Sequence, residues 1–250
     1  MKNIKIGLQL YSVREFFEND VEKCFARVKE IGYDAVELYG PFKYPANEIK
    51  ALLEKYKIEI CGYHTAFDAL KDDFFYATTA YNQIIGNKNI IVPIITEEMS
   101  NSKLEYEEKI KEFKKIHSKL AKDGFNFGYH AHAIDFRDVE GQTPWDMIIS
   151  QMPKDFIMQL DTANALCAKL DPVKILEKYP NMSKTLHYKP FSNITQYDSM
   201  ICEDDLNWEE IVRATKEISS CEYIIVEHET IDKNMEHVEM CYKNIKKLLG

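Results

Sequence analysis

Short apolar runs alternate along the chain with longer segments in which apolar residues recur every three or four positions. The runs have the length of buried strands, and the longer segments have the period of amphipathic helices. The predicted strands cover residues 4–10, 33–39, 58–64, 89–95, 125–132, 156–161, 184–189 and 223–228. The predicted helices cover residues 15–32, 46–56, 68–86, 101–122, 143–152, 171–179, 207–219 and 233–249.

This uninterrupted alternation predicts an α/β protein, a single-domain (β/α)8 TIM barrel over residues 1–250. No Pro/Gly/Ser-rich linker, low-complexity segment or break in composition divides the chain. The alternative is an open doubly wound sheet. That fold is disfavoured because the first predicted strand lies in IGLQLYSVRE, which lacks the GxGxxG pattern of dinucleotide-binding sheets.

Charge and cysteine usage narrow the function classes. The net charge of −9 argues against a nucleic-acid partner and suits an uncharged or metal-bridged small molecule. The six cysteines form no CxxC pair, which is typical of reduced thiols in a reducing compartment. No signal segment and no apolar run of membrane-spanning length is visible, so we expect a cytoplasmic protein without a membrane partner.

Four predicted strands in the second half of the chain end in side chains that metals favour. Because the carboxyl ends of parallel strands converge at one end of a barrel, these side chains should meet there. The pattern predicts one mononuclear metal centre. The residues are His130 and His132, Asp161, His187 and Lys189, and Glu227 and Glu229.

The residue types indicate the chemistry of this centre. Side chains two apart on a strand share a face, so His130 lies with His132 and Glu227 with Glu229. Asp161, Glu227 and the His187 imidazole suit one divalent cation, Mn²⁺, Mg²⁺, Co²⁺ or Zn²⁺. A cation with open positions chelates two neighbouring substrate oxygens and stabilises an enediolate next to a carbonyl.

Each of these residues also has a structural explanation. Asp161 could cap the turn that begins at Thr162, and a single strand histidine is more often hydrogen-bonded than metal-bound. Glu227 and Glu229 could be solvated at a strand end. Together the residues favour a metal site, because buried unpaired charge at one barrel end is costly without a metal or partner.

Six segments together resemble the xylose isomerase-like barrel superfamily, and within it the sugar phosphate isomerase/epimerase branch. They are IGLQLYSVRE, GYDAVELYG, GYHAHAIDF, LDTAN, LHYKP and IVEHE. The resemblance implies one divalent metal, often Mn²⁺, bound by residues from strands five to eight. It implies Asp161, His187 and Glu227 as ligands, with His130 at the position that carries glutamate in sugar epimerases.

The strand-five segment departs from the family pattern. One branch has a YHNHDFEF-like segment where this chain has YHAHAIDF. In the epimerases two glutamates both bind the metal and move protons, so here His130 or His132 would be the second base beside Glu227. Lys189 is the remaining catalytic candidate, because it could stabilise an enolate oxygen.

Other strand ends supply candidates for substrate binding. Glu37 ends the second predicted strand, His64 ends the third, and Lys189 follows His187 on the same face. Each residue could instead have a purely structural role. In that case the Lys189 side chain would reach solvent from the rim of the barrel.

The expected function is a metal-dependent isomerase or epimerase acting on a sugar, keto-sugar or polyol in carbohydrate metabolism. The same residues are equally compatible with a metal-dependent dehydratase or β-eliminating lyase acting on an inosose or 3-keto-glycoside, because such a reaction needs one base and one acid. An endonuclease IV-like nuclease is remote, because strand four ends without a histidine and Asn164 stands where a further histidine is expected. A non-catalytic sugar-binding barrel is the other remote alternative. The resemblance leaves a homo-oligomer open.

Overall fold

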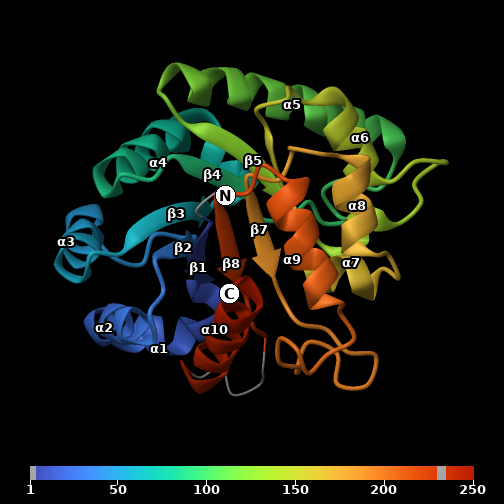
Figure 1. Cartoon of the computed structure of the whole chain (residues 1–250). Coiled ribbons are helices and arrows are strands. Elements are labelled where there is room, and N and C mark those ends of the chain that lie inside the picture. Colours follow the sequence, from blue (N-terminus) through green and yellow to red (C-terminus); the bar gives the residue numbers. More distant parts are fainter. Residues whose placement is uncertain (1–3, 230–234) are drawn as a thin grey trace.

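Eight parallel strands follow one another in chain order around a barrel, and helices surround it (Figure 1). The computed structural model describes residues 4–229 and 235–250. The predicted (β/α)8 barrel is therefore confirmed. The strands are β1 (Lys5–Gln9), β2 (Ala35–Tyr39), β3 (Glu59–His64), β4 (Asn89–Val92), β5 (Asn126–His130), β6 (Ile157–Gln159), β7 (Thr185–Tyr188) and β8 (Tyr223–Val226).

The barrel is nearly closed. Among the described strands, a continuous ladder is missing only between β6 and β7, where the ring is completed by a single bridge. The hydrogen-bonded ladders run in the order β6-β5-β4-β3-β2-β1-β8-β7. Between the two ends of this order, Asp161 and His187 form an isolated parallel bridge, in which the His187 backbone N–H donates to the Leu160 carbonyl at 2.9 Å. Two predicted metal ligands thus lie where the barrel closes.

The α-helices cover the outside of the strands and bury their apolar faces against them (Figure 1). They are α1 (Arg14–Asn19), α2 (Val21–Ile31), α3 (Ala46–Tyr56), α4 (Asp72–Ile85), α5 (Lys103–Lys122), α6 (Pro144–Gln151), α7 (Thr162–Cys167), α8 (Pro172–Lys178), α9 (Trp208–Glu217) and α10 (Met235–Leu249). Short 3-10 helices cover Leu10–Val13, Phe67–Leu70 and Ala133–Phe136. No helix in the described part of the chain is both long enough and apolar enough to cross a bilayer.

Two helical predictions were wrong in detail. The helix predicted for 15–32 is divided at Asp20, whose carboxylate accepts the Lys23 backbone N–H and starts α2. Helix α7 was not predicted and begins directly after Asp161, which caps it. Residues 233 and 234 of the last predicted helix lie outside the described residues.

The barrel interior is polar where the strands end. Gln9, Glu37, Gln159, Asp161 and His187 are all almost completely buried there. Glu37 needs space beside β3, because a Cβ atom at Gly62 would lie 2.3 Å from its Oε1 atom. The glycine therefore permits a buried carboxylate beside the histidines of this barrel end.

Candidate metal centre

The ends of β5 to β8 bring four ligand-type side chains together. One ligand atom from each of His130, Asp161, His187 and Glu227 lies within 4.8 Å of the others. All four side chains are buried. The structure thus gathers the four predicted ligands into a cluster that could hold a metal ion.

Asp161 has one oxygen in use and one free. Its Oδ1 accepts the Asn164 backbone N–H at 2.7 Å, so the capping role also proposed for Asp161 is confirmed. Its Oδ2 is buried without a hydrogen-bond partner, and Lys189 Nζ lies 3.9 Å away. Burial raises the pKa of Asp161 to about 7, although Lys189 opposes this. A buried, unpartnered carboxylate oxygen is the feature expected of a metal ligand.

His187 lies between two carboxylates. Its Nδ1 is 2.6 Å from Glu227 Oε2, and its Nε2 is 2.6 Å from Glu37 Oε2. Burial alone would lower the pKa of His187, but Glu37 and Glu227 raise it to about 10. Without metal the ring is therefore an imidazolium. A ligand histidine whose second nitrogen donates to a carboxylate is common in metal sites, and Glu37 is placed for that role.

Glu37 lies deeper than a substrate-binding residue would need to be. It is fully buried and accepts from Gln9 Nε2 at 2.8 Å, Gln159 Nε2 at 2.9 Å and His187. His64 Nε2 is 3.1 Å from the same carboxylate. Burial alone would raise the pKa of Glu37, but His64 and His187 hold it well below its usual value. Glu37 therefore stays ionised and orients the two histidines.

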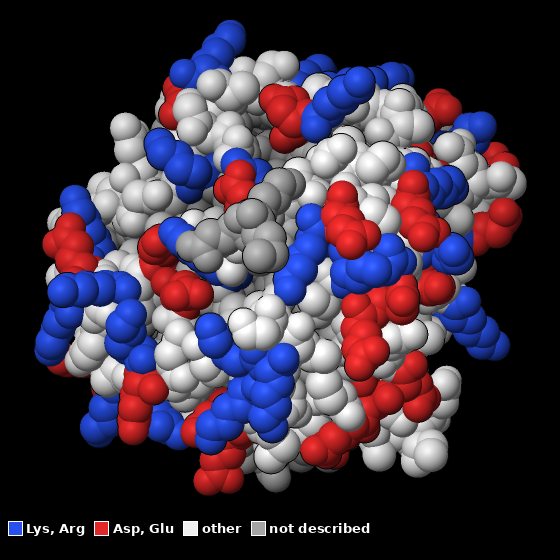
Figure 2. Space-filling model, in the orientation of Figure 1, with Lys and Arg blue, Asp and Glu red and all other residues white. Residues whose placement is uncertain are grey.

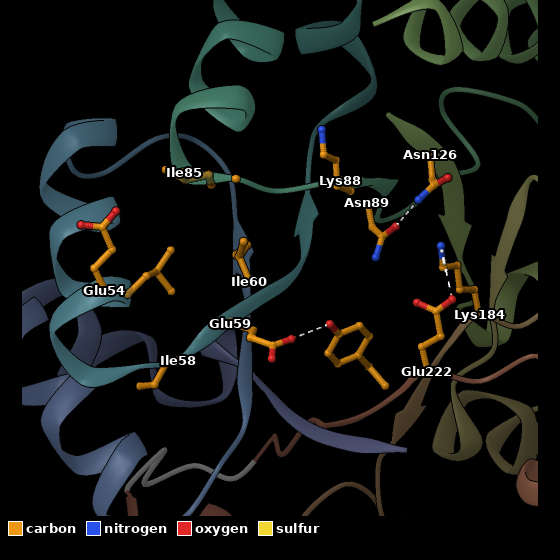
Figure 3. A pocket seen from close by; sticks show the side chains of 13 residues that line it. Glu54, Ile58, Glu59, Ile60, Ile85, Lys88, Asn89, Asn126, Lys184 and Glu222 are labelled. Atoms are coloured by element: carbon orange, nitrogen blue, oxygen red, sulfur yellow. Dashed lines mark hydrogen bonds and ion pairs between the residues drawn. The ribbon is translucent and has the colours of Figure 1, made fainter. Parts of the chain in front are cut away.

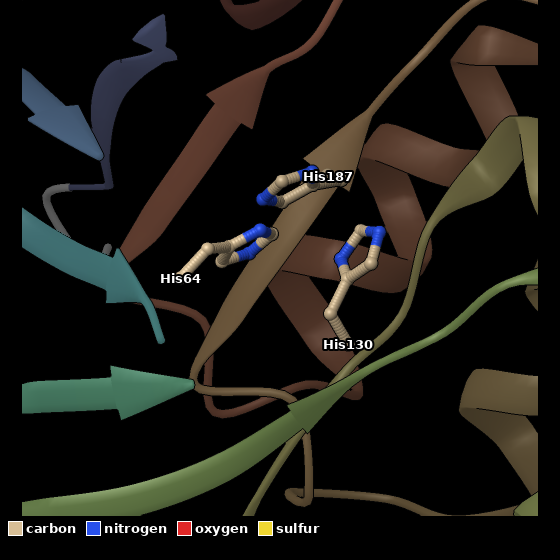
Figure 4. A group of neighbouring side chains, drawn as sticks. All are labelled: His64, His130 and His187. Atoms are coloured by element: carbon tan, nitrogen blue, oxygen red, sulfur yellow. The ribbon is translucent and has the colours of Figure 1, made fainter. Parts of the chain in front are cut away.

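The rings of His64, His130 and His187 lie next to one another (Figure 4). The His64 and His187 rings are parallel, with centroids 5.3 Å apart, and the His130 centroid lies 4.4 Å from that of His187. Sequence reasoning missed the residue that joins two of them. Gln159 Oε1 lies 2.8 Å from His64 Nε2 and 3.0 Å from His130 Nδ1. The available signal was a polar residue inside the apolar run FIMQLD.

Lys189 is buried, so its alternative as a solvent-reaching rim residue is wrong. It is 2% exposed, and its Nζ lies 3.0 Å from Glu229 Oε1 and 3.5 Å from Glu227 Oε1. Burial alone would lower the pKa of Lys189, but Glu227, Asp161 and Glu229 raise it.

The centre carries more negative than positive charge. Among the described residues, Lys189 and the His187 imidazolium face four carboxylates, those of Glu37, Asp161, Glu227 and Glu229. With all carboxylates ionised, two negative charges remain uncompensated, or one when Glu229, whose side chain is 36% exposed, is left out. Buried excess charge is costly, and a divalent cation would neutralise it.

A cavity of about 290 Å³ opens beside this cluster. Its polar lining includes His64, His130, His132, Glu227 and Glu229, and its other lining residues are Gln9, Tyr11, Tyr39, Gly40, Ala66, Pro93 and Ile94. His132 Nδ1 is buried without a hydrogen-bond partner, and burial lowers the pKa of His132 to about 4. His132 is therefore a neutral imidazole with an unpartnered nitrogen beside the cavity.

A larger cavity, of about 570 Å³, lies at the amino ends of the strands and contains none of the predicted site residues (Figure 3). Several of its polar groups pair with one another. Tyr223 donates to Glu59 at 2.8 Å, and Asn126 donates to Asn89 at 2.7 Å. This end of a TIM barrel serves stability rather than catalysis, so the smaller cavity is the candidate site.

No known protein family and no curated protein matches the chain by sequence. Solved structures do match. A sugar phosphate isomerase/epimerase from Parabacteroides distasonis superposes with a TM-score of 0.85 and 21% identity, over 98% of this chain and 94% of that one. The chain therefore shares its (β/α)8 fold with this protein.

Other barrels of this kind have different chemistries. The probable 3-DHS dehydratase AsbF from Bacillus anthracis superposes with a TM-score of 0.71 and 13% identity, over 99% of each chain. An AP endonuclease, family 2, from Brucella melitensis superposes with a TM-score of 0.74 and 15% identity, over 94% of this chain and 97% of that one. At these identities the likeness shows the fold, and activity must be argued from the site.

Proposed function

We propose that this protein is a divalent-metal-dependent isomerase or epimerase of a sugar, keto-sugar or polyol. The observation that carries the proposal is the unpartnered, buried Oδ2 of Asp161 within the four-ligand cluster beside the cavity. Asp161, His187, Glu227 and His130 would hold the ion, and their mixed oxygen and nitrogen atoms suit Mn²⁺ first, with Mg²⁺, Co²⁺ or Zn²⁺ as alternatives. When bound, the cation would supply Lewis-acid stabilisation of an enediolate.

Two unlike bases of the chain line the cavity for proton transfer. Burial alone would raise the pKa of Glu227, but Lys189 and His187 hold it well below its usual value, so Glu227 is a carboxylate. His132 is a neutral imidazole with a free nitrogen. In an epimerisation, Glu227 would remove the proton from carbon, and His132, after taking up a proton from solvent through the cavity, would return a proton to the opposite face.

Of the remaining candidate residues, some would contact the substrate and others would orient neighbouring side chains. His64 lines the cavity and is placed to meet a substrate hydroxyl. Glu37 is enclosed by its donors, and we assign it to orienting His187 and His64 rather than to the substrate. Lys189 would hold Glu227 ionised and present a positive charge near the reacting oxygens.

A dehydratase or β-eliminating lyase acting on an inosose or 3-keto-glycoside is the second candidate. The inequality of Glu227 and His132 favours it, because elimination does not need two matched bases on opposite faces of the substrate. The probable dehydratase from Bacillus anthracis, which has the same fold, supports this alternative.

A nuclease has less support. Among the described residues, β4 leads into Pro93 and Ile94 rather than a histidine, and Asn164 is engaged by the Ala131 carbonyl and the Tyr197 hydroxyl. Basic and acidic side chains are interspersed over the face in Figure 2, which shows no continuous basic surface there. A non-catalytic sugar-binding barrel would bind sugar without exchanging a carbon-bound proton.

The test combines metal content with proton exchange. Metal per chain is measured by elemental analysis, and the Mn²⁺-loaded protein is incubated in D₂O with ketoses, aldoses, inososes and 3-keto-glycosides and followed by NMR. Deuterium at carbon with altered configuration supports an isomerase or epimerase, and loss of water or of an aglycone supports the lyase. Absence of exchange and turnover with every class rejects both, and three zinc ions per chain would favour the nuclease. Asp161→Asn is the inactive control.

A further inference from the structure

We propose that Gln159 is a positioning residue that fixes the ring tautomer of His130, so that the unprotonated Nε2 of His130 faces the metal site. The consequence for the metal rests on the proposed function, whereas the tautomer itself is a property of the metal-free protein. Gln159 lies on β6, two residues before Asp161, and its side chain is completely buried.

All hydrogen-bonding positions of the Gln159 amide are filled. Its Nε2 donates to Glu37 Oε1 at 2.9 Å and to Thr185 Oγ1 at 2.8 Å. Its Oε1 lies within hydrogen-bond distance of His64 Nε2, at 2.8 Å, and of His130 Nδ1, at 3.0 Å. An amide has two N–H donors and two acceptor lone pairs, so this set completes it.

Glu37 dictates which way the amide points. The carboxylate of Glu37 also receives Gln9 Nε2 and His187 Nε2, and an ionised carboxylate only accepts hydrogen bonds. Rotating the amide by half a turn would place its oxygen against Glu37 Oε1 and its NH₂ group against the two histidines. The orientation with oxygen toward the histidines is therefore the one that satisfies the network.

The amide oxygen in turn determines which ring nitrogen of His130 and of His64 carries the proton. An amide oxygen only accepts, so His130 must donate through Nδ1 and His64 through Nε2. A second proton, on His130 Nε2, would not be accepted by Asp161, because Asp161 Oδ2 lies 3.8 Å away. His130 is therefore neutral, and its Nε2 carries the lone pair.

That lone pair faces the free oxygen of the site. His130 Nε2 lies 3.8 Å from Asp161 Oδ2, which is too far for a hydrogen bond. Two electron-rich atoms thus approach each other without a proton between them, as two ligands of one ion do. Without Gln159, the favoured arrangement would move the His130 proton to Nε2, where it would face Asp161 and occupy the ligand position.

The first measurement uses the full-length, metal-free protein. Long-range ¹H–¹⁵N correlation spectra of histidine-labelled protein distinguish protonated from unprotonated ring nitrogens, and the His130 signals are assigned by their loss in His130→Asn. We expect a neutral His130 protonated at Nδ1. A His130 protonated at Nε2, or at both nitrogens, would overturn the proposal even if no Gln159 variant folds.

The second measurement compares two buried glutamines that bind the same carboxylate. Gln159→Leu removes the acceptor of His130, whereas the matched control Gln9→Leu removes another Glu37 donor. Within the described part of the chain, the hydrogen bonds of the Gln9 side chain go to Glu37 and to the Tyr11 backbone and not to a histidine. We expect Gln159→Leu to move the His130 proton to Nε2 and to weaken Mn²⁺ binding, measured by calorimetry, by roughly 10- to 100-fold. Gln9→Leu should leave the His130 tautomer unchanged.

A Gln159→Leu protein that keeps the wild-type tautomer, or the wild-type Mn²⁺ affinity, would refute the positioning role. Failure of the proposed function would look different. The wild-type spectrum would still show His130 protonated at Nδ1, but the wild-type protein would not bind Mn²⁺.

Discussion

The two ends of the barrel treat their polar groups in opposite ways. At the amino ends of the strands, a cavity of about 570 Å³ is lined by groups that satisfy one another, such as Asn126 with Asn89 and Tyr223 with Glu59. At the carboxyl ends, a cavity of about 290 Å³ is lined by His132, whose buried Nδ1 has no hydrogen-bond partner, and by His130 and Glu227. Asp161, in the same ligand cluster, also has a buried oxygen without a partner. Buried polar atoms without hydrogen-bond partners, rather than the size of the cavity, distinguish the functional end.

The charges differ in the same way. Lys5 and Glu59 at the amino end form an ion pair whose side chains are 37% and 49% exposed, so water screens both. At the carboxyl end, Lys189, His187, Glu37, Asp161 and Glu227 are almost completely buried, and only Glu229 is partly exposed. An excess of negative charge is tolerable at a solvated surface but costly in this interior, which favours a bound cation only at the carboxyl end.

The largest expected effect comes from removing a ligand. Asp161→Asn keeps an oxygen that accepts the Asn164 N–H but removes the negative charge, and His187→Gln removes the imidazole. Each should abolish stoichiometric Mn²⁺ binding and lower turnover by more than the roughly 10- to 100-fold that loss of an outer partner costs. Elemental analysis after gel filtration checks this, with Glu59→Gln as the control from the other end. A full metal equivalent in both ligand variants would refute the assignment.

The next largest effect is a dependence of the metal affinity of the carboxyl-end site on pH. Metal binding at His187 Nδ1 requires loss of a proton from a group whose pKa is about 10, so protons compete with metal below that pH. Affinity should therefore rise with pH, by roughly tenfold per unit between pH 7 and 10. Below pH 7 the slope should steepen, because Asp161, with a pKa of about 7, also takes up a proton. Calorimetry in buffers of different ionisation enthalpy measures the protons released, and a pH-independent affinity would contradict this mechanism.

A smaller effect concerns stability. A ligand that binds the folded state at 100 times its Kd adds about 2.7 kcal/mol, which for a chain of this size raises the unfolding midpoint by roughly 5–11 °C. Thermal unfolding followed by circular dichroism should show this shift on Mn²⁺ addition to the wild type and to Glu59→Gln. Asp161→Asn should show no shift, and a shift in that variant would mean that Mn²⁺ binds elsewhere.

The smallest effect belongs to the amino end. Glu59→Gln removes the ion pair with Lys5 and weakens the contact with Tyr223, both partly solvated. The expected loss is below about 1 kcal/mol in the free energy of unfolding, measured by urea denaturation. A loss of several kcal/mol would show that this end also holds a strained charge network and would weaken the contrast between the two ends.

The alternation of strands and helices was readable because both depend on local periodicity. The meeting of His130, Asp161, His187 and Glu227 followed from the same pattern, because parallel strands bring their carboxyl ends together. Helix α7 was missed since it spans six residues, too few for a helical period to show, and only its cap, Asp161, was visible. The break at Asp20 was hidden by apolar residues that continue on both sides.

The network beneath the ligands could not be derived from the sequence. Glu37 meets His187 across 150 positions, and Gln159 meets Glu37 across 122. No local pattern encodes such pairs, because they depend on where each strand stands in the closed barrel. The substrate-binding role expected of Glu37 followed from its place at a strand end, and only its depth and its donors indicate a positioning role.

The contact between β6 and β7 completes the ring of strands in the barrel. Asp161 and His187 form that link through their backbones, and their side chains are the ones proposed to share an ion. A bound cation would thus add a second link between the two strands at the ends of the ladder, so ion binding would stabilise the closed ring. Chelation should accordingly speed hydrogen exchange at the His187 amide more than at amides in the β1–β2 ladder.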